Sequence, residues 1–406
     1  MKLIKTLRHA IIGLFRNPHR LRKVVVFIIV TAILFMLSAV FNNTVENLIL
    51  KFIIRYAWIL LSVLFLIIRH GEVMKRRGFD TFFHSINHTD FNGNPPDYKY
   101  HALQNEYLDK TRFVSLIPQC EWLKIQDKLE MLFNRKIYKI ESLEDNMMIT
   151  DIYTIAEKLP TIIPWSDDCM VEGRSFAVGE SYQGRVIWNA VELPHGIIAG
   201  STGSGKTALL RCIIHQAIMK RFNVTLFDFK GGGDYSGLDC QKVSEPEEAR
   251  DLLTALIVEV RGRMEKFKEA GVSNIDEYNA LGRGRHIPWL LVIDEAAEIL
   301  DVKPKDKAQK ELYTDIDQSL RTLARISRAA GVHILFGLIR PDSNVIDGQI
   351  KNNLLFRCCG YFADPAASRI VLDNDKATEL PPNVKGRFII GDEEVQAYYL
   401  PLPDSD

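Results

Sequence analysis

A run of eight residues in the second half of the chain has the composition and spacing needed to hold a phosphate. Glycines in such a run let backbone N–H groups turn toward an anion, at the positive end of the helix that follows. The pattern GxxxxGK[ST] is matched in full by Gly200, Ser201, Thr202, Gly203, Ser204, Gly205, Lys206 and Thr207. We expect this run to bind ATP, with Lys206 reaching the β- and γ-phosphates and the Thr207 hydroxyl ligating Mg²⁺.

The flanking residues favour a nucleotide site over a chance glycine loop. Residues 196–199 are an apolar run typical of a short buried strand, and residues 208–220 repeat apolar side chains at helical spacing. A strand, the complete motif and a helix in this order form the context in which the motif works. The helix is expected to bury a wide face made of Leu209, Leu210, Ile213, Ile214, Ala217 and Ile218.

A second apolar strand supplies acids for the same site. Residues 289–293 are apolar and are followed directly by Asp294 and Glu295. At the carboxyl end of a strand, Asp294 can bind the hydrated Mg²⁺ ion, usually through a water molecule, and Glu295 can polarise the attacking water. Any strand can end in acids, so this pair takes its meaning from the complete phosphate-binding motif before it. Lys206, Asp294 and Glu295 are therefore predicted catalytic residues, and Thr207 and Asp294 are the predicted metal ligands.

A third loop leaves two interpretations open. Residues 224–229 are predicted to form another strand, which ends in Asp228 and a glycine-rich stretch that continues to Gly233. Loops at the carboxyl ends of the strands line the ligand crevice of an open α/β sheet. This loop either faces the nucleotide or a polymer, or merely reverses the chain.

The pattern of elements predicts an α/β fold. Residues 176–178 and 185–188 read as two strands around a glycine-containing turn, and apolar strands then alternate with helical patterns to the end of the chain. Such alternation is typical of a doubly wound sheet with helices on both faces. We predict a RecA-like P-loop NTPase domain with a mainly parallel sheet over residues 176–406.

At these residues the chain resembles the FtsK/SpoIIIE family of DNA-translocating ATPases. The resemblance covers the chain from Phe176 to its last residue, more than half of its length. Its motifs are the phosphate-binding run with His195–Ala199 before it, the loop from Asp228 to Gly233, and Val292–Ala296, followed by Ser327–His333, Arg340–Pro341, Val345–Asn353 and Ser368–Asp373.

The resemblance extends to the order of the parts. Two apolar segments, a small segment and then this motor look most like the coupling proteins of conjugative elements in Gram-positive bacteria. That likeness implies ATP and Mg²⁺ as cofactors, DNA as the polymer, and a relaxase and type IV secretion channel components as partners. It also implies a homo-hexameric ring, in which an arginine of one subunit stabilises transition-state charge in its neighbour. Arg328 is the first candidate, ahead of Arg340 and Arg325, although a surface ion pair or simple packing is the alternative for each.

The chain departs from the family at one informative place. Where the family usually has Ala-Thr-Gln before Arg-Pro, this chain has Gly337, Leu338 and Ile339. The resemblance implies that the glutamine senses the γ-phosphate, and the Ile339 side chain has no polar atom for that task. Another polar group then substitutes, or hydrolysis is slower than in relatives. Lysines and arginines that could face a central DNA channel are Lys230, Lys351 and Arg357, although each alone could simply be solvated.

The N-terminal region is predicted to be a membrane hairpin. Val24–Phe41 is an uninterrupted apolar run, and Leu48–Ile68 is a second one with two basic residues near its start. Each approaches the roughly 20 residues that span a bilayer. Basic residues cluster in residues 1–23 and after residue 68, so the positive-inside rule places both termini and the ATPase domain in the cytoplasm. The second run argues against a cleaved signal peptide, and the basic flanks argue against a buried core hairpin.

Two segments separate this hairpin, residues 24–70, from the motor. Residues 71–100 are rich in His, Asn, Asp, Gly and Pro and are predicted to be a linker, and residues 101–175 a small α+β segment. In that segment a helical pattern covers residues 118–133, and strand patterns cover residues 135–141 and 147–154. The six cysteines form no CxxC pair, so reduced thiols are expected rather than a metal site.

The net charge leaves the choice of polymer open. The 406 residues carry a formal net charge of zero, so the chain lacks the overall basic balance that would by itself point to nucleic acid, although a local basic stripe suffices for DNA. A membrane ATPase that drives protein export is a second hypothesis. A non-hydrolysing scaffold that recruits a relaxase or channel component is a third, which Ile339 favours and the intact Asp294–Glu295 pair opposes.

Overall fold

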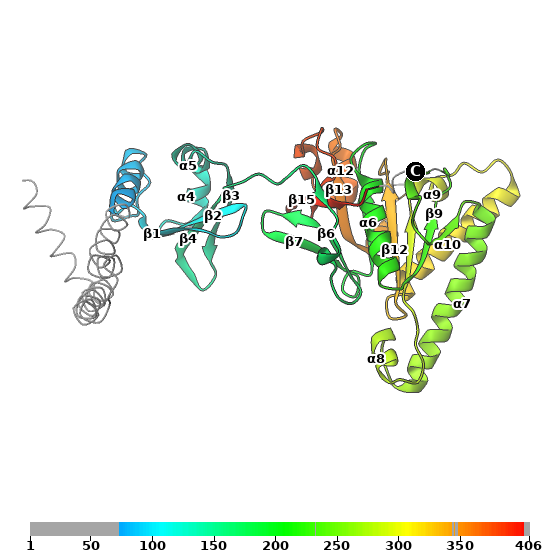
Figure 1. The fold of residues 1–406 in the computed structure, drawn as a ribbon. Coiled ribbons are helices and arrows are strands. Elements are labelled where there is room, and N and C mark those ends of the chain that lie inside the picture. The colour runs from blue at the N-terminus through cyan, green and yellow to red at the C-terminus, as the bar shows by residue number, and fades with distance from the viewer. Residues whose placement is uncertain (1–72, 232, 343–344, 346–347, 402–406) are drawn as a thin grey trace, which may run out of the picture. The chain divides into compact units, whose positions relative to one another are not determined.

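The computed structural model describes residues 73–231, 233–342, 345 and 348–401 (Figure 1). The predicted hairpin, residues 24–70, and the basic N-terminus lie outside these residues. Among the described helices, none is both long and apolar enough to cross a bilayer. Two compact units divide the described chain: the first contains residues 73–101, 111–129 and 139–152, and the second contains residues 102–110, 130–138 and 153–401.

A four-stranded sheet and short helices follow the N-terminal region. Residues 73–85 are helical, inside the segment expected to be a linker. The predicted helix over residues 118–133 is interrupted at Ile125, whose N–H turns back to the Trp122 carbonyl. The sheet has the order β1-β2-β4-β3, and the elements are β1 (Asp97–Leu103), β2 (Leu108–Val114), α4 (Gln119–Lys124), α5 (Gln126–Phe133), β3 (Ile137–Leu143) and β4 (Asn146–Ile155).

The motor is built on an 11-stranded sheet, in which β5 pairs with β15 beside the path β10-β9-β11-β12-β8-β13-β14-β15-β6-β7. Its strands are β5 (Ile163–Pro164), β6 (Ser175–Ser181), β7 (Gly184–Asn189), β8 (His195–Ala199), β9 (Asn223–Phe227), β10 (Gln241–Val243), β11 (Trp289–Ile293), β12 (Val332–Leu338), β13 (Leu354–Gly360), β14 (Arg387–Ile390) and β15 (Glu393–Tyr399). Its helices are α6 (Lys206–Met219), α7 (Pro246–Ala270), α8 (Ile275–Ala280), α9 (Ala297–Leu300), α10 (Lys307–Ile326), α11 (Gly348–Lys351) and α12 (Pro365–Leu372), with short 3-10 turns at Asp167–Cys169, Gly233–Tyr235 and Lys376–Glu379.

The sheet is mixed, which corrects the expectation of a mainly parallel one. The strands from β10 to β13 along the sheet run parallel, as the alternation of strands and helices predicts. The strands β14, β15, β6 and β7 join antiparallel, because β6–β7 and β14–β15 are hairpins joined by short turns, without the crossover helix that parallel strands need.

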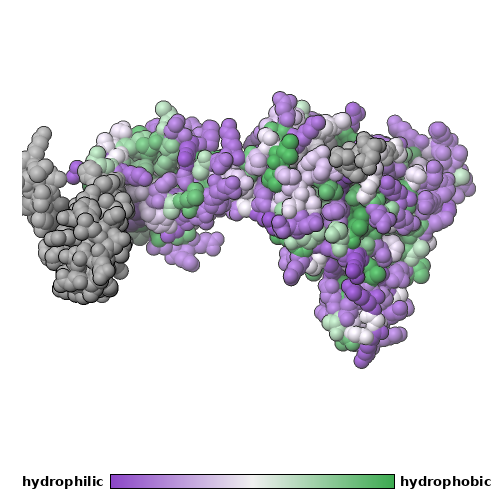
Figure 2. Space-filling model, in the orientation of Figure 1, coloured by the Kyte–Doolittle hydropathy of each residue, from purple (hydrophilic) through white to green (hydrophobic). Residues whose placement is uncertain are grey.

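Successive side chains of the central strands feed two cores on opposite faces of the sheet, as the period of two requires. In β11, Leu291 and Ile293 join the core that contains α7 and α10, while Leu290 and Val292 join the core that contains α6. The predicted buried face of α6 is confirmed, with Ile218 only partly buried. On the face of the molecule seen in Figure 2, the described surface is mostly hydrophilic, and the hydrophobic side chains form small separate patches.

Candidate nucleotide site

The phosphate-binding run connects β8 to α6, as predicted, and its glycines are required by the backbone. Gly203 and Gly205 have φ of 84° and 98°, a region that side chains with a Cβ rarely adopt. A Cβ on Gly205 would also lie 2.5 Å from the backbone nitrogen of Gly386. The N–H of Gly386 donates to the Ser204 carbonyl over 2.7 Å. The residue directly before β14, a strand whose role the sequence did not reveal, therefore packs against the loop.

Lys206 and Asp294 meet across the strand β12, which lies between β8 and β11 in the sheet. Lys206 Nζ donates to the Asp294 carbonyl oxygen over 2.5 Å and to Asp294 Oδ1 over 2.9 Å. Lys206 is only 5% exposed. Gly337 of β12 makes this approach possible, because a Cβ there would lie 2.1 Å from the Asp294 carbonyl oxygen. Steric exclusion of a Cβ therefore explains why this chain has Gly337 where the family usually has alanine.

Tyr235 is a member of the site that sequence reasoning missed. It follows the glycine-rich loop and is 1% exposed. Its hydroxyl donates to Asp294 Oδ1 over 2.5 Å. Burial, reinforced by the Asp294 charge, raises the pKa of Tyr235 far above its ordinary value, so the phenol keeps its proton. No local pattern identifies a single tyrosine in the connection between β9 and β10.

Glu295 lies beside Asp294 with its carboxylate held by a backbone donor. The N–H of Ile339 donates to both carboxylate oxygens, over 3.2 Å and 3.0 Å. Burial raises the pKa of Glu295, while this N–H and the nearby Lys206 and Lys230 oppose the rise. Lys230 Nζ lies 3.9 Å from Glu295 Oε2 and 3.7 Å from Glu298 Oε1. Lys230 of the glycine-rich loop therefore faces the nucleotide site, which favours the first of the two interpretations of this loop.

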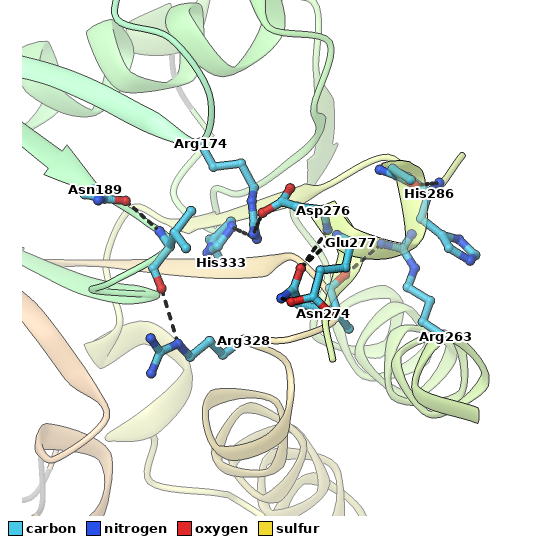
Figure 3. A network of polar contacts seen from close by, with 12 residues as sticks. Arg174, Asn189, Arg263, Asn274, Asp276, Glu277, His286, Arg328 and His333 are labelled. Carbon is cyan, nitrogen blue, oxygen red and sulfur yellow. Dashed lines mark hydrogen bonds and ion pairs between the residues drawn. The ribbon is translucent and has the colours of Figure 1, made fainter. Parts of the chain in front are cut away.

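The structure does not bring Arg328 to this site within one chain. Arg328 is exposed just before β12, and its Nε donates to the Val191 carbonyl over 3.2 Å (Figure 3). It lies beside a network in which Arg174 contacts His333 and Asp276. The strand β12 has 7 residues, so at about 3.3 Å per residue its ends are roughly 20 Å apart. Arg328 is at the end remote from the phosphate-binding run, and it can act on a nucleotide only in another subunit.

The other candidate cations differ in their distance from the nucleotide residues and in their ion-pair partners. Arg325 is exposed near the end of α10, and Arg340 is exposed after β12, at the carboxyl edge where the nucleotide residues lie. Lys351 and Arg357 both bind the Asp373 carboxylate, over 2.6 Å and 2.5 Å, and these contacts lower the pKa of Asp373. Both cations are therefore paired with an acid of the same chain.

The residues present fit a nucleotide with its cation. The loop offers backbone donors in a cradle that only glycine forms, with Lys206 and Thr207 at the start of α6. Within it, the Ser204 hydroxyl oxygen is buried without a hydrogen-bond partner, although buried polar atoms ordinarily have one. A phosphate could supply that partner. Thr207 and Asp294 supply the kind of oxygen ligands that Mg²⁺ prefers.

Comparison with known proteins identifies the family. The FtsK/SpoIIIE family model matches residues 175–343. The solved structure of the pCW3 conjugation coupling protein TcpA, in a monomer form with ATPγS, is 34% identical, with a TM-score of 0.60. The alignment covers 81% of this chain and 96% of that one. The chain belongs to the FtsK/SpoIIIE family. It is a P-loop ATPase of that family, and the resemblance read from its motifs is confirmed.

The curated relatives are longer members of the FtsK/SpoIIIE family. The DNA translocase FtsK of Oceanobacillus iheyensis is 29% identical over 54% of this chain, and that of Clostridium tetani is 31% identical over 55% of it. The matched regions cover 32% and 33% of those proteins. The chain thus matches about a third of the length of these FtsK relatives.

Proposed function

We propose that the chain is a membrane-anchored, ATP-hydrolysing DNA translocase that acts as a conjugative coupling protein. The observation that carries the proposal is the pairing of Lys206 with Asp294, next to Glu295, in a chain similar to a conjugation coupling protein over 96% of that solved chain. In this proposal it works as a homo-hexamer and delivers DNA, with its relaxase, to type IV secretion channel components. The apolar runs Val24–Phe41 and Leu48–Ile68 anchor it in the cell membrane with both termini in the cytoplasm.

The mechanism follows from the residues that meet at the carboxyl edge of the sheet. The backbone donors of the phosphate-binding run hold the phosphates, and Lys206 exchanges its contact with Asp294 for the β- and γ-phosphate oxygens. When bound, Mg²⁺ neutralises charge on those oxygens, and Thr207 and Asp294 are the residues that would hold it. Glu295 takes the proton of the attacking water, and the Ile339 N–H fixes the direction of its carboxylate.

Two features make the site dependent on other subunits and on a polymer. Arg328 lies too far from the nucleotide of its own chain, so its charge would serve a neighbour in a head-to-tail ring. Lys230 of the glycine-rich loop lies near Glu295 and Glu298. Movement of this loop against DNA could therefore change the position of the Glu295 carboxylate, which activates the water. Contact with DNA would be largely to the backbone, and binding would therefore weaken with salt.

The test is the ATPase rate of the full chain in lipid nanodiscs, with and without single- and double-stranded DNA. We expect a DNA-dependent rate that Lys206→Ala and Glu295→Gln abolish, with ATP binding lost in the first variant and retained in the second. The strand type that stimulates more identifies the polymer that is moved. If neither DNA changes the rate of an oligomeric sample, DNA pumping is wrong. Stimulation by a polypeptide would then favour protein export, and no hydrolysis at all would favour a recruitment scaffold.

A further inference from the structure

The Tyr235 hydroxyl contacts one of the two residues expected to hold the cation. It donates to Asp294 Oδ1 over 2.5 Å. A phenol has one proton, and an ionised carboxylate can only accept, so the proton of Tyr235 goes to Asp294.

The same contacts leave one Asp294 oxygen available. Both side-chain hydrogen bonds that the carboxylate accepts in the described structure, from Tyr235 and from Lys206, fall on Oδ1. Oδ2 is then the oxygen that can turn to a cation. When Lys206 moves to the phosphates, Tyr235 is the contact that keeps the Asp294 carboxylate in place.

Two basic side chains donate hydrogen bonds to the backbone carbonyl groups at and beside Tyr235. Arg211 of α6, 4% exposed, donates to the carbonyl oxygens of Asp234 and Ser236. Lys242 Nζ donates to the Tyr235 carbonyl oxygen over 3.1 Å. Three successive carbonyl groups are thus tied to side chains from α6 and β10. These hydrogen bonds restrain the backbone at Tyr235 and so hold its hydroxyl beside Asp294 at the proposed cation site.

We propose that Tyr235 is a positioning residue for the divalent cation, which orients Asp294 so that its second carboxylate oxygen is presented to Mg²⁺. The inference rests on the proposed function, because it requires that the chain bind ATP with Mg²⁺. It assigns the connection between β9 and β10 to the cation site, where the sequence indicated only a glycine-rich loop. Partners of metal ligands typically change metal affinity by about 10- to 100-fold when they are removed.

The experiment separates the cation from the nucleotide. A fluorescent ATP analogue that cannot be hydrolysed is bound to the full chain in nanodiscs, first in EDTA and then over a Mg²⁺ titration. We expect Tyr235→Phe to need about tenfold more Mg²⁺ for half-maximal effect, with the affinity in EDTA unchanged. The matched control is Tyr398→Phe, which removes another buried phenol that donates to a carboxylate, that of Glu180. It should leave both values unchanged.

Lys242→Met provides a second variant, because Lys242 is exposed and its loss should not prevent folding. It should shift the Mg²⁺ midpoint in the same direction by less, and the shift should not add to that of Tyr235→Phe, since both act through one hydroxyl. A midpoint equal to wild type in Tyr235→Phe, or in Lys242→Met if the first variant does not fold, overturns the proposal. An equal shift in Tyr398→Phe overturns it too. Absence of any Mg²⁺ effect in the wild type would instead count against the proposed function.

Discussion

The backbone N–H of Ile339 donates to both carboxylate oxygens of Glu295, so the residue that replaces the family's glutamine contacts the predicted base without using its side chain. We therefore expect Ile339→Ala to keep the DNA-stimulated ATPase rate within about twofold of wild type. Ile339→Pro removes the N–H, and loss of a hydrogen bond to a charged group should lower the rate roughly tenfold or more.

The control for both variants is the affinity for ATP and the melting temperature, which should stay close to wild type. A rate that falls as far in Ile339→Ala as in Ile339→Pro would mean that the Ile339 side chain, rather than the backbone donor, matters to hydrolysis.

Asp373 restrains two cations that the sequence placed in a DNA channel. Lys351 and Arg357 share its carboxylate. We expect Asp373→Asn to release both and to strengthen DNA binding at low salt. The slope of log affinity against log salt should steepen by about one to two units, because up to two more phosphates can be neutralised. Asparagine tolerates the left-handed backbone at this position, φ 64°, so the fold should be kept.

A matched control for that variant is Asp392→Asn, which makes the same change of charge and releases Lys376 instead. Fluorescence anisotropy of labelled DNA across a salt series measures both. If the two variants steepen the slope equally, the effect is one of net charge, and the cluster around Asp373 has no special access to DNA.

The sequence predicts those parts of the site that depend on neighbours in the chain. Gly203, Gly205 and Lys206 form a contiguous motif, and Asp294 with Glu295 ends an apolar strand, so pattern alone located both halves. The alternation of strands and helices likewise predicted the parallel strands from β8 to β13. The motif Ser327–His333 identified the family because many residue types recur there together.

Contacts between distant segments were not predictable in this way. Tyr235 reaches Asp294 across 59 positions of sequence, and a single tyrosine has no periodic or spacing signal. The Ile339 donor is a backbone N–H, which every residue except proline has. The residue type at position 339 therefore gives no sign of this contact. The turn between β6 and β7 was expected from the sequence, whereas the antiparallel joins β13–β14 and β15–β6, and the pairing of Lys351 with Asp373, depend on which segments become neighbours in the fold.

Two buried histidines make the stability of the motor depend on pH. His333 and His195 are 0% exposed, and burial lowers the pKa of His333 to about 3 and of His195 to about 4, from an ordinary 6.5. Between these values the unfolded chain binds more protons than the folded one. The free energy of unfolding should therefore fall as the pH drops below about 6.5, by up to about 1.4 kcal/mol per pH unit for each histidine.

Urea unfolding of the full chain between about pH 7 and about pH 5 measures this slope. The Pro194 carbonyl can only accept, so His333 Nδ1 carries the proton in their 3.0 Å contact. Asparagine can donate to the same carbonyl without titrating. We expect His333→Asn to reduce the slope by about one proton, and an unchanged slope would contradict the assignment.

Arg328 should act on the nucleotide of a neighbouring subunit, because it lies at the opposite end of β12 from Lys206. Arg328→Ala should retain ATP binding and lose hydrolysis by a factor of about 10³ or more, the value of such an arginine in other ATPases and GTPases. Lys206→Ala should be inactive through loss of binding. Neither variant alone then has a complete site.

Mixing these two inactive variants decides between action in the neighbour and action within one chain. In randomly mixed rings, about a quarter of the interfaces combine an intact Lys206 from one subunit with an intact Arg328 from the next. We expect the mixture to regain DNA-stimulated hydrolysis that neither variant shows alone. The variant Arg328→Lys keeps the charge but loses the planar guanidinium. We expect it to recover little of the hydrolysis that Arg328→Ala loses. If the mixture stays as inactive as its components, although exchange of labelled subunits proves that mixed rings formed, Arg328 does not complete the neighbour's site, and its contact with the Val191 carbonyl is its structural role.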